Sequence, residues 1–277
     1  ASLTAYGEEG PERDRKGFDQ LAYWARSGLM DIMREPDTLP TQGLPGMGDH
    51  PTAVSLYAGI VTALLHRERS GEGAMVHTSL LANGVWSAAG IVQGAMAGAD
   101  MTRYRNRNRI YAPMLRPYET ADRRWLQFNM IRDEEMLTRL LVALDAVELL
   151  GDSRFPDLET IFGEARESFG EEIQKIVRTK SATEWLRELD RYGLPVNLVA
   201  TVEEAAVDEQ VRINAMAVEP ANGELDTPWI INHPVKVTSV AQVGPRRAPA
   251  LGEHSREILG ELGYSPEEID ALVPRAI

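Results

Sequence analysis

Short apolar runs alternate with longer segments of helical periodicity, and this alternation constrains the fold more than any other feature. Apolar runs of strand length lie at 74–80, 125–131, 196–200 and 233–240, and SLTAYG near the start of the chain has the same character. The longer segments between them repeat apolar residues every three to four positions, which is typical of amphipathic helices. Alternating strands and helices predict an α/β fold.

The helical segments carry start and stop signals. Pro51 suits the first position of a helix with His50 as its N-cap, and the SGEG sequence after Arg69 ends that helix. Thr201 and Glu204 have the spacing of a capping box. The expected helices cover 18–34, 51–69, 81–98, 133–150, 155–178, 182–192 and 201–214, with two more within 251–273, the second starting at Ser265.

Two segments interrupt this pattern and predict domain boundaries. Residues 96–112 are strongly basic and lead into prolines, and residues 216–230 are rich in Pro, Gly and Asn. Linkers of this composition favour a small domain over 113–215, inserted into a larger domain whose two parts are 1–95 and 231–277.

Composition disfavours several classes of function. The chain has 277 residues, no cysteine and a net charge of −13. Without cysteine there are no disulfides, thiolate zinc sites or cysteine nucleophiles, and a cytoplasmic location is expected. The negative charge disfavours a general nucleic-acid binder, and the lack of a long apolar run disfavours a membrane span. The first residues lack the basic and apolar regions of a signal peptide.

Familiar catalytic motifs are missing, so the chemistry is expected to depend on a carboxylate. The sequence has no GxGxxG after a strand, no P-loop and no GxSxG elbow. Its five histidines form neither an i,i+4 pair nor an HExxH motif, so no metal site is expected.

Asp49 is the best-placed carboxylate and lies in the sequence GMGDHPTA. A helix start offers unpaired N–H groups that keep a carboxylate ionised and favour an anionic ligand or a developing oxyanion. Gly46 and Gly48 leave room for close approach, and their N–H groups are candidate oxyanion donors. Alternatively, Asp49 only caps the helix.

Three segments match one family in order and spacing: SLTAYGEEGPERDRKGFDQLAYWARSGLM, GMGDHPTAVSLYAGIVTALLHRERSGEGAMVHTSLL and PALGEHSREILGELGYSPEEI. On these segments the chain resembles the family III CoA-transferases, also called the CaiB/BaiF family. The resemblance implies that Asp49 is a nucleophile and that coenzyme A passes from an acyl-CoA to a carboxylic acid without a metal. It also implies a Rossmann-type large domain built from both ends of the chain, an inserted small α+β domain and an intertwined homodimer.

The same resemblance assigns roles around Asp49, which would pass through a mixed anhydride and an aspartyl-CoA thioester. Asp19 matches a position that is acidic in transferases of this family, where it would orient the site or shield the anhydride. Alternatively, Asp19 caps a helix that begins near Gln20.

A basic cluster is the expected CoA-binding segment. Lys16 matches a residue that contacts the CoA nucleotide in some relatives, and Arg13 and Arg15 flank it. Local cations in an acidic chain suit a ligand that carries several phosphate charges. Alternatively, the arginines belong to a solvated loop.

Phe18 separates two branches of the family. Racemase members carry a histidine at this position, which moves a proton together with the aspartate, and phenylalanine has no proton to move. Arg132 falls near the second carboxylate of the racemases. Both residues favour a transferase over the alternative, a racemase-like enzyme acting on an α-methylacyl-CoA.

Family members carry a segment upstream of the SLTAYG strand that supplies the first strands of the Rossmann unit and much of the CoA pocket. This chain begins at that strand, so we expect a fragment, an interlocked copy or a second chain that supplies the missing half. A non-catalytic CoA-binding or partner subunit is the alternative function. Ion pairs across the dimer are the expected role of the alternating arginines Arg103, Arg105, Arg107 and Arg109, and contact with CoA is the alternative. Core or interface positions are expected for Trp86, Trp125 and Trp229.

Overall fold

The computed structural model describes residues 1–35, 37–102, 113–129, 133–221, 225–241 and 244–273. The chain divides into two compact units, residues 1–197 and 198–277. Helices and strands mix along the chain and one strand pair is parallel, so the α/β expectation is confirmed at that level. Within the described residues, we find no helix that is long and apolar enough to span a bilayer.

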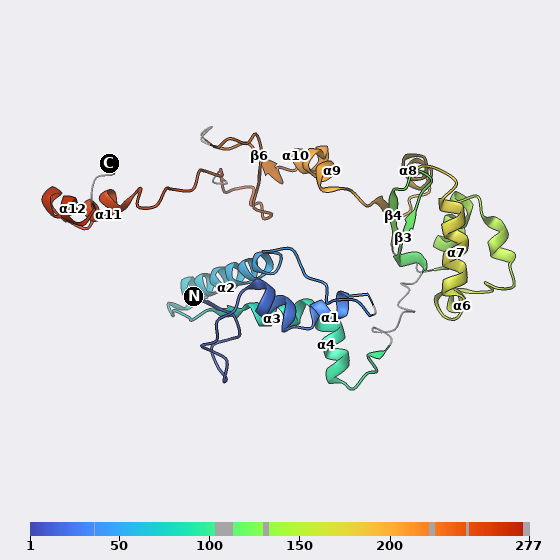
Figure 1. The fold of residues 1–277 in the computed structure, drawn as a ribbon, viewed down its shortest axis with the longest axis horizontal. Helices are drawn as coiled ribbons and strands as arrows, with labels where there is room; N and C mark the ends of the chain where they lie inside the picture. The colour runs from blue at the N-terminus through green and yellow to red at the C-terminus, as the bar shows by residue number, and fades with distance from the viewer. Residues whose placement is uncertain (36, 103–112, 130–132, 222–224, 242–243, 274–277) are drawn as a thin grey trace. The chain divides into compact units, whose positions relative to one another are not determined.

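A parallel strand pair and a set of helices make up residues 1–101. Their bounds are β1 (Ser2–Thr4), η1 (Asp19–Ala25, a π-helix), α1 (Leu29–Met33), α2 (Asp49–Ser70), β2 (His77–Ser79), α3 (Leu80–Ser87) and α4 (Ala89–Met96) (Figure 1). Leu3 of β1 faces Thr78 of β2 in the register of the pair. The buried centre of this part comes from η1 and α3 and consists of Ala22, Tyr23, Trp24 and Leu80.

Five of the expected helices are broken, those over 18–34, 81–98, 133–150, 155–178 and 201–214, which corrects the prediction. The first two lie in residues 1–101. The segment 18–34 divides into η1 and α1 because Gly28 takes a left-handed conformation with φ of +89°, and the preceding Ser27 hydroxyl bonds the Tyr23 carbonyl. The segment 81–98 divides at Ala88, which lies between α3 and α4. The periodicity of the apolar residues continues across both breaks, so pattern alone does not reveal them.

Helix α2 begins slightly earlier than expected. Its first residue is Asp49 and its N-cap is Gly48, so the prediction that His50 is the N-cap is wrong. Its end is as predicted, because Gly71 adopts a left-handed conformation and its N–H group bonds the Arg67 carbonyl at 2.8 Å.

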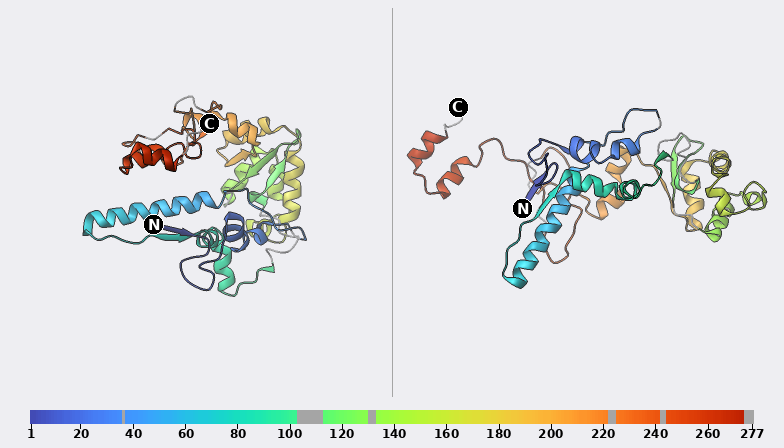
Figure 2. Two further views of the ribbon diagram at one scale, coloured as in Figure 1. Left: turned by 60° about the vertical axis from the view of Figure 1, so that its left-hand side comes forward. Right: turned by 90° about the horizontal axis from the view of Figure 1, so that it is seen from below.

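Most of the apolar surface of α2 is exposed. Thr52 is its buried residue, and Figure 2 shows the helix extending away from η1 and α3. The large apolar side chains left exposed are Val54, Tyr57, Val61, Leu64 and Leu65. A helix normally buries such a stripe against another element.

Residues 113–197 carry a small sheet with helices packed beside it (Figures 1 and 2). The sheet order is β3-β4-β5, from β3 (Pro117–Glu119), β4 (Trp125–Phe128) and β5 (Val196–Leu198), and β3 pairs with β4 in antiparallel fashion. The helices are η3 (Pro113–Leu115), α5 (Glu134–Ala143), η4 (Val147–Gly151), α6 (Leu158–Phe162), α7 (Arg166–Val177) and α8 (Ala182–Arg191). Its fully buried side chains include Tyr118, Phe128, Phe169 and Trp185.

Residues 198–277 contain short elements. They are α9 (Val202–Val207), α10 (Glu209–Ile213), β6 (Ala217–Val218), β7 (Ile230–Ile231), α11 (Ser255–Glu261) and α12 (Pro266–Leu272). The capping box at Thr201 is confirmed, and Ser265 forms a second one with Glu268. The helix expected over 201–214 divides at Asp208.

The strand expected over 233–240 is wrong. Pro234 supplies no N–H group for a sheet, and the His233 ring accepts the Val235 N–H group at 3.2 Å. Val240 then closes a turn onto the Val237 carbonyl. The division into an inserted domain over 113–215 and a larger domain from 1–95 and 231–277 stays a prediction.

Candidate active site

Asp49 is the first residue of α2 and its side chain is exposed. Within the part of the chain that the structure describes, its carboxylate makes no hydrogen bond or ion pair. An N-capping aspartate bonds a backbone N–H group one turn ahead, and Asp49 lacks that bond. The carboxylate therefore stands free at the start of α2.

Asp19 is the second carboxylate of the site and is buried, with 6% of its surface exposed. Its Oδ2 atom accepts the Gly46 N–H group at 2.8 Å, and its Oδ1 atom accepts the Gly48 N–H group at 3.1 Å. The alternative in which Asp19 caps its own helix is wrong, because Phe18 is the N-cap of η1 and no side chain caps it. Asp19 instead binds the loop that leads into Asp49.

Gly48 is held so closely that no larger residue fits. A Cβ atom at this position would lie 2.2 Å from Asp19 Oδ1 and 2.4 Å from the Tyr23 ring. Gly43, earlier in the same loop, lies equally close to the Trp24 ring, where a Cβ atom would be 2.1 Å away. Glycines are needed here because the loop packs directly on η1.

The backbone donors around Asp49 differ from those expected. Asp19 already occupies the N–H groups of Gly46 and Gly48, so these groups do not serve as oxyanion donors in this structure. The N–H groups of His50 and Thr52 bond the carbonyls of Gly46 and Gly48. Among the described residues, the N–H group of Asp49 has no acceptor, and it is the donor left at this helix start.

A basic pocket of about 280 Å³ lies beside η1. Its lining comprises Tyr6, Arg15, Lys16, Leu21, Ala25 and Arg26. The structure thus brings two of the predicted basic residues together and adds Arg26, which the sequence analysis missed. Arg26 follows η1 directly, and nothing in its sequence neighbours signals that it lines the same pocket as Lys16.

Glu12 organises two of these cations. It forms ion pairs with Arg15 at 2.5 Å and with Arg26 at 2.9 Å, and hydrogen bonds first from Arg26 and then from Arg15 hold the pKa of its carboxyl below the usual range. The Lys16 ammonium group has no ion pair or hydrogen bond among the described residues. Arg13 does not line the pocket and instead pairs with Asp14 at 3.1 Å.

A match to the sequence model of a protein family identifies the family of this chain. The sequence model of CoA-transferase family III matches residues 1–255. The chain belongs to CoA-transferase family III. Family membership agrees with the features around Asp49 and confirms the resemblance found in the sequence.

Curated relatives of this family III chain are named CoA-transferases. It is 28% identical over 274 residues to the (R)-2-hydroxy-4-methylpentanoate CoA-transferase of Clostridioides difficile, covering 98% of this chain and 67% of the relative. It is 29% identical to the cinnamoyl-CoA:phenyllactate CoA-transferase of Clostridium sporogenes, covering 98% of this chain and 66% of the relative. The chain therefore spans about two thirds of the length of these relatives.

Solved structures share the fold of the family III chain. The orthorhombic crystal form of Rv3272 from Mycobacterium tuberculosis matches with a TM-score of 0.74 and 24% identity, covering 91% of this chain and 64% of that one. A CaiB/BaiF family protein from Brucella suis matches with a TM-score of 0.74 and 21% identity, covering 94% and 66%. At these identities the likeness establishes the fold.

Other residues singled out in the sequence lie elsewhere or outside the described residues. Arg132 and the arginines at 103, 105, 107 and 109 lie outside the described residues. Phe18 is 74% exposed at the start of η1. The three tryptophans expected in the core or an interface are all exposed: Trp86, Trp125 and Trp229. The prediction of core positions is therefore wrong, and the prediction of interface positions stays a prediction.

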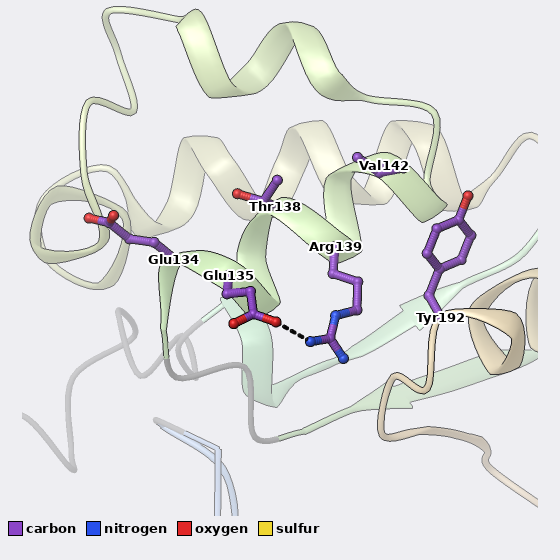
Figure 3. A pocket seen from close by; sticks show the side chains of 6 residues that line it. All are labelled: Glu134, Glu135, Thr138, Arg139, Val142 and Tyr192. Carbon is purple, nitrogen blue, oxygen red and sulfur yellow. Dashed lines mark hydrogen bonds and ion pairs between the residues drawn. The ribbon is translucent and has the colours of Figure 1, made fainter.

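A separate hollow of about 450 Å³ lies on α5 (Figure 3). Its lining consists of Glu134, Glu135, Thr138, Arg139, Val142 and Tyr192. Arg139 is already paired with Glu135 at 2.6 Å, as the dashed line in Figure 3 shows. None of the predicted site residues lines this hollow, and among the described residues no cluster of His, Asp and Glu suits a metal ion.

Proposed function

We propose that this protein transfers coenzyme A from an acyl-CoA to a carboxylic acid, with Asp49 as the nucleophile. The observation that carries the proposal is the carboxylate of Asp49, exposed and without a partner in the described residues, at the first position of α2. Family membership and the names of the relatives support the same reaction.

Each step exchanges one acyl bond for another. The Asp49 carboxylate attacks the thioester carbonyl, the CoA thiolate leaves, and a mixed anhydride forms. The thiolate then attacks the aspartyl carbonyl of the anhydride, which releases the first acid and leaves an aspartyl-CoA thioester. The acceptor carboxylate attacks this thioester and expels the thiolate, and the thiolate attacks the acyl carbonyl of the new anhydride. The products are the new acyl-CoA and free Asp49.

This scheme places definite demands on the protein. Each tetrahedral intermediate needs a hydrogen-bond donor for its oxyanion, and the N–H group of Asp49 is the donor that the described helix start offers. The proton balance needs no general acid, since the attacking and leaving groups are carboxylates and thiolates. A proton-moving residue is therefore not required, and Phe18 beside Asp19 suits a transferase better than a racemase.

Trapping at Asp49 tests the assignment. The protein in its active assembly is incubated with acyl-CoA and then with hydroxylamine, which attacks the anhydride or thioester at the aspartyl carbonyl. We expect peptide mass spectrometry to find a hydroxamate at Asp49. Transfer activity with no label there under saturating acyl-CoA would contradict the covalent scheme.

The basic pocket is the proposed site for the phosphates of CoA. Lys16 is free of partners in the described residues, and Arg15 and Arg26 supply further cations around the same space. The Arg15 guanidinium also lies 5.5 Å from the centre of the Tyr6 ring, so the pocket combines charge with an aromatic wall. Such a combination suits a nucleotide carrying several negative charges.

Removing a cation from this pocket is expected to weaken binding of acyl-CoA. Lys16→Ala and Arg26→Ala should each raise the KM for acyl-CoA about 10- to 150-fold, since a charge-assisted hydrogen bond is worth roughly 1.5–3 kcal/mol. The kcat should change little, because the pocket does not touch the reacting carbons. Arg67→Ala, which removes a cation paired with its neighbour Glu68, is the matched control. An unchanged KM in both pocket variants would exclude this site.

We also propose that another chain covers β1, β2 and α2, as a second, interlocked copy of this chain or as a companion chain. Parallel sheets are covered on both faces and a two-stranded sheet is marginal on its own, yet Leu3 of β1 is exposed together with the apolar side of α2. Light scattering of the active species should give at least twice the chain mass or include a companion chain. Full activity from one 30.7 kDa chain would contradict this.

A further inference from the structure

Helix η1 holds the loop 43–48 through several of its side chains. Gln20 Nε2 donates to the Gly43 carbonyl at 2.7 Å, and the Trp24 ring lies directly against Gly43. Asp19, the first residue of η1, accepts two backbone N–H groups of the same loop. The loop ends where Asp49 begins α2. By holding the loop, η1 therefore determines the position of Asp49.

The carboxylate of Asp19 is fully engaged in this contact. Each of its oxygens accepts one N–H group, the side chain is buried, and among the described residues no Lys, Arg or His pairs with it. Its negative charge is balanced by the dipoles of the bound backbone N–H groups. A group used in this way is not available to touch an acyl carbon or to move a proton.

We infer that Asp19 is a positioning residue, which fixes the carboxylate of Asp49 for attack by holding the N–H groups of Gly46 and Gly48. This inference rests on the proposed function of Asp49. Of the two roles expected for Asp19, it keeps the orientation of the site. It rejects the shielding of the anhydride, because a shield must contact the reacting atoms.

Asp19→Asn is the most informative change. It preserves the shape of the side chain but replaces one acceptor oxygen with an NH₂ donor that faces a backbone N–H group, so one of the two bonds is lost. A shift of the nucleophile by roughly 1 Å costs about 10²-fold in rate. We expect kcat to fall by about that factor, the KM for acyl-CoA to stay within about 2-fold, and amide exchange to rise at residues 44–50 alone.

The partition between transfer and hydrolysis distinguishes positioning from shielding. With a displaced nucleophile, formation of the anhydride slows and both products decrease together, so their ratio is unchanged. With a missing shield, water reaches an anhydride that forms at the normal rate, and hydrolysis of acyl-CoA rises relative to transfer. A raised hydrolysis ratio in Asp19→Asn would overturn our inference.

Two further variants keep the test decisive. Asp157→Asn makes the same chemical change at a carboxylate that accepts the backbone N–H group of Thr160 at 2.7 Å in α6, and it should leave kcat unchanged. Asp19→Glu keeps the charge and both acceptor oxygens but pushes the loop outward, so it should fold and still lose about 10²-fold in kcat. If Asp19→Asn does not fold, Asp19→Glu decides the matter, and wild-type kcat in Asp19→Glu rejects the positioning role.

The inference about Asp19 and the proposed function of Asp49 can fail independently. If the wild-type protein yields the Asp49 hydroxamate while Asp19→Asn transfers CoA at the normal rate, only the inference about Asp19 fails. If no hydroxamate forms on Asp49 in the wild-type protein, the proposed function itself fails.

Discussion

Asp49→Asn is expected to reduce CoA transfer to the background rate, a loss of about 10⁴-fold or more, because it removes the atom that forms the covalent bond. The amide keeps the shape of the side chain but is a far poorer nucleophile than the carboxylate. The hydroxamate label should vanish together with transfer, and Asp49→Ala should behave in the same way. Steady-state rates and peptide mass spectrometry measure both effects.

Stability provides the control for Asp49. Its carboxylate makes no hydrogen bond within the described part of the chain, so the melting temperatures of both variants should stay near that of the wild type. If Asp49 were a cap instead, alanine would cost roughly 0.5–2 kcal/mol of stability, and asparagine, itself a good cap, would cost little. A stable Asp49→Asn protein with full activity would falsify the assignment of the nucleophile.

Gly48→Ala is expected to damage both stability and activity. The added methyl group would overlap with Asp19 Oδ1 and with the Tyr23 ring, and neither is free to move because both are buried. Overpacking of this kind costs about 1–3 kcal/mol. The loop must move away from η1, so the kcat should also fall by about 10²-fold. Thermal melts and initial rates measure the two losses.

Gly90→Ala is the matched control for Gly48→Ala. Gly90 lies in α4, where a Cβ atom would meet nothing within 4 Å. Alanine is favoured over glycine in a helix by about 0.5–1 kcal/mol, so this variant should be as stable as the wild type or more so, with unchanged activity. Equal behaviour of the two variants would show that the close approach at Gly48 has no importance.

Features that depend on neighbouring residues in the sequence were predictable. The capping boxes at Thr201 and Ser265 and the left-handed Gly71 after α2 arise from contacts within one turn. The helix that begins at Asp49 also follows from local pattern. What local pattern misses is the break at Gly28, because the apolar spacing of η1 continues into α1.

Features that depend on contacts across the chain were not predictable in the same way. Asp19 precedes the loop that it binds by 27 and 29 residues, so its role becomes visible only when η1 and the loop lie side by side. Arg26 lines the same pocket as Lys16 because η1 is a π-helix with a wide turn. Nothing in the sequence around Arg26 signals this turn. Gly46 and Gly48 suggested space for a ligand, and the structure shows that Asp19 and Tyr23 fill the space beside Gly48.

The pairing of Ser2 with His77 in the β1–β2 sheet has a consequence for the order of events during synthesis. At about 5–20 residues per second, a ribosome needs roughly 4–15 s to make the segment between these two partners. Gly84, which packs against the Tyr23 backbone, emerges later still. During that interval η1 lacks α3, the helix that packs against it. A half-made chain is therefore expected to leave η1, and the loop that Asp19 holds before Asp49, less ordered than the finished chain does.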